Sequence, residues 1–165
     1  MRDHDVAARQ VIAEAMRADG TANVDPALVE AGLAIETRNA ERLAAIVDDG
    51  GWPSVVHVGM EGVEAAWYIA SHAGCDLELQ RRCLDLMTEA VAAGEPSPDR
   101  LAWLTDRVLV AEGKAQRYGT QFATTDEGLR LLEVDDPEGL DARRAAVGLP
   151  PLGEQLDRLR SDLQG

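Results

Sequence analysis

Apolar residues recur at helical spacing along most of this chain, and a glycine ends nearly every such stretch. Hydrophobic residues make up 45% of the chain but aromatic residues only 4%, so the core must consist mainly of Ala, Leu and Val. Such a core favours close-packed helices over a β-sandwich. We expect six or seven helices, which begin near Asp5, Pro26, Met60, Asp76, Pro98, Asp136 and Pro151.

The helical pattern is interrupted in two places. The segment Gly50–Gly59 combines helix-breaking residues with Trp52 and His57, which is typical of an ordered connector packed on the core. Farther along, Arg117–Phe122 and Leu129–Val134 alternate with period two on either side of a turn rich in Thr, Asp and Gly. The sequence therefore predicts a mainly α protein, a compact helical bundle with one β-hairpin near residues 117–134, and a single domain over residues 1–165.

The formal net charge of −14 limits the classes of partner. A negative field repels the phosphate backbone of nucleic acids and the anionic face of a membrane, so neither is expected as a partner. No segment approaches the roughly 18 uninterrupted apolar residues of a membrane span. The chain begins without an apolar leader and has only two cysteines, Cys75 and Cys83, which together indicate a soluble protein of the reducing cytoplasm.

Familiar catalytic and cofactor signatures are missing from the sequence. It contains no GxSxG, GxxxxGK[ST], GxGxxG or HExxH motif. The cluster of His72, Cys75, Asp76 and Cys83 lacks the paired spacing of a structural zinc site, and Cys83 lies on an apolar helix stripe. We therefore expect no metal and no cofactor.

The densest group of polar side chains lies between Leu104 and Phe122. Tyr118 is a candidate catalytic residue, and Tyr118 and Gln121 would orient a ligand on the hairpin. Arg107 would hold an anionic group of that ligand with its planar guanidinium. The alternative is that Arg107 forms an ion pair with a neighbouring acid.

A second group of candidates lies on the preceding helices. His72 is the best placed of three histidines for acid–base chemistry, with Trp67 on the same helix as a ligand contact; an inert histidine bonded to a carbonyl is the alternative. Gln80 interrupts an apolar stripe, so its amide needs a hydrogen-bond partner. That partner would be Tyr118, Gln121, a ligand or a structural network.

Several segments of the chain resemble a widespread bacterial family catalogued only as a domain of unknown function. They are RNAERL (38–43), GWPSVVHVGMEGVEAAW (51–67), LQRRCL (79–84), LTDRVLVAEGKAQRYGTQF (104–122) and ARRAAVGLPPL (142–152). The resemblance covers almost the whole chain and implies a bacterial, single-domain, cytoplasmic protein. It implies no particular activity, cofactor or catalytic residue.

Together these features lead to two functional hypotheses. The first is a small-molecule-binding domain, with catalysis left open, whose polar pocket lies between the His72 helix, the Gln80 helix and the 117–134 hairpin. The alternative is a non-catalytic helical module for protein–protein interaction, which docks another chain through Trp52–Val58 or the terminal leucine stripe. Formation of a homodimer through the last helix is compatible with either hypothesis.

Overall fold

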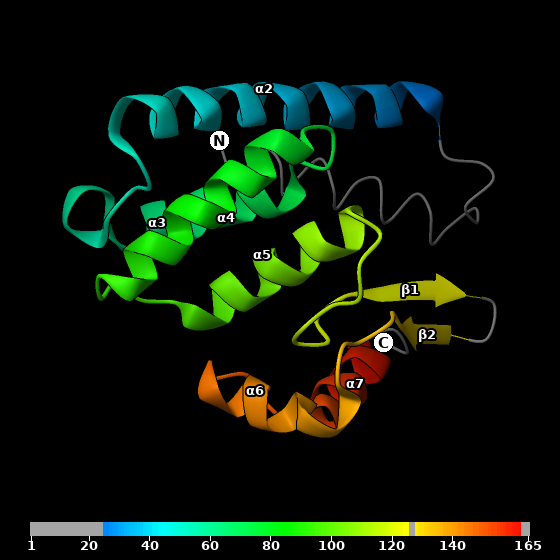
Figure 1. Ribbon diagram of the computed structural model, residues 1–165. Helices are drawn as coiled ribbons and strands as arrows, with labels where there is room; N and C mark the ends of the chain where they lie inside the picture. Colours follow the sequence, from blue (N-terminus) through cyan, green and yellow to red (C-terminus); the bar gives the residue numbers. More distant parts are fainter. Residues whose placement is uncertain (1–24, 126–127, 163–165) are drawn as a thin grey trace. The chain divides into compact units, whose positions relative to one another are not determined.

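A computed structural model describes residues 25–125 and 128–162 of the protein (Figure 1). The helix predicted from Asp5 lies outside these residues. The described part is mainly α, as predicted, with six α-helices, one short 3-10 helix and one two-stranded antiparallel hairpin. The elements are α2 (Pro26–Gly50), α3 (Val55–His72), α4 (Leu77–Ala92), α5 (Pro98–Ala111), β1 (Phe122–Thr125), β2 (Gly128–Leu131), η1 (Pro137–Gly139), α6 (Leu140–Ala146) and α7 (Leu152–Asp162).

The chain divides into two compact units, one ending at Leu86 and the other beginning at Met87. In the first unit α2 packs on α3, and the buried apolar residues include Leu43, Val63 and Ala70. In the second unit α6 contacts both η1 and α7, and Leu104, Val108 and Leu140 are buried. The single domain expected over residues 1–165 stays a prediction.

Two helices begin where the sequence places their caps. The Asp25 carboxylate accepts a hydrogen bond from the Ala27 N–H at 2.9 Å, with Pro26 in the first turn of α2. The Asp76 carboxylate likewise accepts the Leu79 N–H at 2.9 Å at the start of α4. These side chains satisfy backbone donors that have no partner within the helix.

The third helix begins earlier than predicted. We expected its first residue near Met60, but α3 starts at Val55 because the Ser54 carbonyl accepts the N–H groups of both His57 and Val58. Gly59 then leaves the helical conformation, with φ 68° and ψ 173°, before the helix resumes. The predicted connector therefore contains one helical turn followed by a break that only glycine adopts without strain.

The hairpin is present, but the predicted position of its first strand was wrong. β1 covers Phe122–Thr125 instead of Arg117–Phe122, and it pairs with β2 in the register Phe122 to Leu131 and Thr125 to Gly128. The preceding residues form a loop because side chains of other elements take up its backbone groups, as described below. Past β2, Val134 forms an isolated parallel bridge with Gln116.

The buried face of α3 also differs slightly from the prediction. Val63, Ala66 and Ala70 are buried as expected, whereas Trp67 is half-buried and Ile69 is buried in its place. Among the described residues, no helix combines the length and apolar character that crossing a bilayer requires.

Candidate functional site

The polar cluster after α5 is built around the carboxylate of Asp106. This side chain is 0% exposed on α5. Its Oδ1 accepts the N–H groups of Arg117 at 2.7 Å and Tyr118 at 3.0 Å. Its Oδ2 accepts both the N–H of Thr120 at 3.0 Å and the Thr120 hydroxyl at 2.9 Å. A buried carboxylate with several such donors is well compensated for its lost hydration.

The guanidinium of Arg144 binds carbonyl groups of the loop 117–121, whose N–H groups bind Asp106. Arg144, on α6, is also 0% exposed. Its Nη1 donates to the carbonyls of Tyr118 at 2.7 Å and Gly119 at 3.2 Å. Its Nε donates to the Pro150 carbonyl at 2.7 Å, and its Nη2 donates to the Gln155 side-chain oxygen. Burial lowers the pKa of Arg144, an effect that the nearby carboxylates of Asp141 and Asp106 oppose.

Two further side chains complete the support of this loop. The Gln116 amide nitrogen donates to the carbonyls of Gln121 and Leu132, both at 3.0 Å, and its oxygen accepts the Gln121 N–H at 2.8 Å. Arg143 donates to the Arg117 carbonyl at 2.9 Å. Because these bonds use the backbone groups that a β-ladder would need, residues 117–121 stay outside the sheet.

The residues predicted to bind a ligand on this loop, Tyr118 and Gln121, also make contacts within the fold. Tyr118 contributes its backbone to the Asp106 and Arg144 contacts, and its half-buried ring has the Arg117 guanidinium 5.8 Å from its centre. The Gln121 side chain donates to the Thr120 hydroxyl at 3.0 Å. Arg107 is half-buried on α5, next to Asp106 in sequence.

Gln80 has its hydrogen-bond partners within the first unit. The side chain is 1% exposed, and its Nε2 donates to the carbonyls of Ala70 at 2.9 Å and Ser71 at 3.3 Å. Of the partners considered from the sequence, this corresponds to a structural network that joins α4 to the end of α3. The bonds bring Gln80 close to the segment that precedes His72.

His72 and Trp67 lie on α3 in the same unit. The Nδ1 atom of His72 is 2.8 Å from the Tyr68 carbonyl oxygen. The His72 and Tyr68 rings are in contact, with centroids 4.2 Å apart and their planes tilted by 38°. These contacts fix the orientation of the imidazole within its own helix. Its proposed role in acid–base chemistry stays a prediction.

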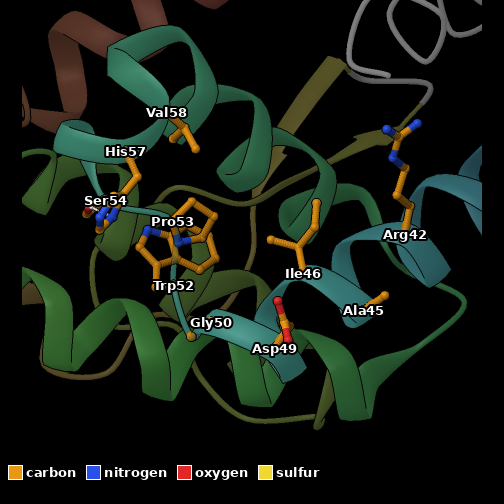
Figure 2. Close-up of a pocket in the computed structure, with 11 residues that line it drawn as sticks. Arg42, Ala45, Ile46, Asp49, Gly50, Trp52, Pro53, Ser54, His57 and Val58 are labelled. Atoms are coloured by element: carbon orange, nitrogen blue, oxygen red, sulfur yellow. Dashed lines mark hydrogen bonds between the residues drawn. The ribbon is translucent and has the colours of Figure 1, made fainter.

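A cleft of about 500 Å³ lies in the first unit, around the connector between α2 and α3. Figure 2 shows Trp52 and Pro53 at its centre, with His57 and Val58 on one side and Ile46 and Asp49 on the other. We call it the Trp52 cleft; its lining residues are Arg42, Ala45, Ile46, Asp49, Gly50, Gly51, Trp52, Pro53, Ser54, His57 and Val58. The α2 residues among them follow Arg42 by three, four, seven and eight positions, so they share one helix face.

A hydroxyl and an imidazole meet in the Trp52 cleft. The Ser54 Oγ lies 2.8 Å from the His57 Nδ1, across the first turn of α3. His57 is exposed and Ser54 is half-buried. The sequence analysis placed His57 in an ordered connector and did not pair it with Ser54; a Ser-x-x-His spacing at a helix start was the available signal for this pair.

The remaining candidates for metal or thiol chemistry carry little support. Within residues 25–125 and 128–162, no group of three His, Cys, Asp or Glu side chains is arranged to hold a metal ion. Cys83 is 0% exposed, and burial raises the pKa of its thiol to about 12. The thiol is therefore protonated and unreactive near neutral pH.

Comparison with known proteins gives a family but no activity. A family model described as "Family of unknown function (DUF6624)" matches residues 1–165, which confirms the resemblance seen in the sequence. No curated protein and no solved structure matches the chain.

Proposed function

This chain belongs to DUF6624, a family of unknown function, and we propose from its structure that it binds a small molecule in the Trp52 cleft. The observation that carries the proposal is the cleft itself, about 500 Å³ with Trp52, Pro53 and Ile46 beside the Ser54–His57 pair. Small-molecule sites typically have volumes of about 300–1,000 Å³, with mostly apolar walls and a few polar groups that orient the ligand.

The Trp52 cleft is preferred over the site predicted near His72, Gln80 and the hairpin. The side chains of Gln80 and Gln121 already have protein partners, at 2.9 Å and 3.0 Å. Their polarity therefore has an explanation that needs no ligand. The walls of the cleft instead include Ile46 and Val58, apolar residues whose side chains are exposed and open to a ligand.

The proposal can be tested with amide NMR spectra of the full chain during titration with metabolite mixtures. We expect some compounds to shift the signals of Trp52 and His57, and these shifts to disappear in Ile46→Glu, which places a charge on the apolar wall. Leu33→Glu is the matched control, because Leu33 is also exposed on α2 (53%, against 42% for Ile46) but does not line the cleft. Binding that is equal in both variants, or no binding at millimolar concentration, would contradict the proposal.

A second candidate function, protein–protein interaction, is favoured by the exposed side chains next to the cleft. Val56 is 88% exposed, and Val58 and Met60 are about half as exposed. Exposed apolar side chains in a group are a common feature of interaction surfaces. We propose self-association of this chain as the form to test, by sedimentation over a range of concentrations, with Val56→Asp expected to leave only monomer. A wild-type protein that is monomeric at every concentration would exclude it.

A further inference from the structure

The carboxylate of Asp49 occupies a position that folding alone disfavours. It lies in the last turn of α2, where the helix dipole presents its negative end and where no basic residue is present. Its neighbour Asp48 is compensated by Arg82, whose Nη1 is 2.8 Å from the Asp48 Oδ1. Asp49 has no such partner among the described residues, and it lines the Trp52 cleft.

Arg42 supplies the opposite charge at the other end of the cleft. It is exposed, and within the part of the chain that the structure describes it has no ion pair. Arg42 and Asp49 are seven residues apart, about two helical turns, so their positions are separated by about 10 Å along α2. Between them the helix presents Ala45 and Ile46 to the cleft (Figure 2).

We propose that the ligand of the Trp52 cleft is a zwitterion with an apolar body, whose ammonium group binds Asp49 and whose carboxylate binds Arg42. The inference rests on the proposed function, since it names the chemistry of the same cleft. The ammonium would also lie near the Trp52 indole, whose ring face attracts cations. The apolar body would cover Ile46 and face Val58, while the Ser54–His57 pair offers a polar contact on the opposite wall.

The spacing of the two positions along α2 sets the scale of the ligand's length. An extended chain advances about 3.3–3.6 Å per residue, so the free ends of a tripeptide are about 10 Å apart. A straight ω-amino acid with eight carbons has a similar length. Both are small enough for a cleft of about 500 Å³, so the two are suitable probes of this chemistry.

The experiment is calorimetric titration of the full chain with alanyl-leucyl-alanine and with ω-aminooctanoate, each compared with its N-acetylated and its C-amidated form. We expect at least one free zwitterion to bind and each blocked form to bind at least about tenfold more weakly, because a charge-assisted hydrogen bond is lost. Asp49→Asn should abolish the preference for a free amine, and Arg42→Gln the preference for a free carboxylate. Asp48→Asn and Arg130→Gln, which change exposed charges outside the cleft, should leave binding unchanged.

The results separate this inference from the proposed function. If neither zwitterion binds, or if blocking the ends makes no difference, the inference is overturned, while other compounds that bind in an Ile46-dependent way would still support a small-molecule site. If no compound of any class binds in the cleft, both fall. Equal losses in the cleft variants and in the two control variants would indicate a general effect of charge and would also overturn the inference.

Discussion

The hydroxyl of Ser71 is buried without a hydrogen-bond partner, which within the described residues is exceptional for a side-chain oxygen. Such a group costs about 1–3 kcal/mol when it loses water and gains nothing in return. We expect Ser71→Ala to raise the unfolding free energy by about 0.5–1 kcal/mol, with a contribution from the better helix propensity of alanine. Urea unfolding of the variant measures this.

Thr120→Ala is the opposite case, because it removes the 2.9 Å hydrogen bond to Asp106 and should lower the unfolding free energy.

Asp106 provides a second prediction about a single side chain. Asp106→Asn keeps the shape but replaces an accepting oxygen with an NH₂ group, which would face the N–H donors of the 117–120 backbone. We expect a loss of about 2–4 kcal/mol in unfolding free energy, the usual scale for breaking a buried charged network.

The matched control for Asp106 is Asp99→Asn in the first turn of the same helix, where the nearest cation, Arg100, is 3.9 Å away. It should change the unfolding free energy by no more than about 0.5 kcal/mol. Equal effects of the two substitutions would show that the buried bonds are unimportant.

The raised pKa of Cys83 has a consequence for stability at alkaline pH. The unfolded chain releases the thiol proton near the usual value of 9.0, whereas the folded chain keeps it until about 12. The contribution of Cys83 is therefore complete below pH 9 and falls by roughly 1 kcal/mol per pH unit above it. Urea unfolding between pH 8 and 10.5 should show a steeper loss in the wild type than in Cys83→Ala, which lacks the titrating group; parallel curves would refute this.

Helix α2 has two acidic residues, Asp48 and Asp49, in its last turn, and they can be compared directly. Asp49→Asn removes the repulsion with the helix dipole and should stabilise the protein by about 0.3–1 kcal/mol. Asp48→Asn removes the same repulsion but also the 2.8 Å pair with Arg82, so its net effect should be near zero. Thermal unfolding at low ionic strength distinguishes them, and a destabilised Asp49→Asn would show that this carboxylate has a structural role.

The helices and the hairpin follow from local patterns, so most of them could be predicted from the sequence. Apolar spacing and caps such as Asp25 and Asp76 act over a few residues, and the helix starts at both positions agree with the structure. The predicted first strand was misplaced because the backbone N–H groups of that segment bind a distant side chain instead of a neighbouring strand. Asp106 lies 11 to 14 residues before the amides that it binds, and no period in the sequence encodes that contact.

The candidate site was less predictable than the fold, for a related reason. The Trp52 cleft combines one face of α2, a connector and the first turn of α3, and its existence depends on the turn that begins at Val55 and stops at Gly59. The need of Gln80 for a partner was correctly inferred, but whether that partner would be a side chain, a ligand or a backbone carbonyl depended on packing. Sequence chemistry identified Gln80 as a group that needs partners, but it did not single out Asp106, Arg144 or Gln116, whose partners come from other elements of the fold.

For the molecule as a whole, we expect the two buried charges after Met87 to make that unit unfold as a whole. Asp106 on α5 and Arg144 on α6 hold one loop between them, and Gln155 on α7 binds Arg144 in turn. Detaching α5 or α6 would leave a buried charge without its partners, and detaching α7 would remove the Gln155 acceptor from Arg144. In hydrogen–deuterium exchange, the amides of Arg117, Tyr118 and Thr120 should therefore exchange as slowly as those of the flanking helices, although they belong to no helix or strand. Such slow exchange would identify this stretch of chain as a single cooperative folding unit, and fast exchange of these three amides would contradict that.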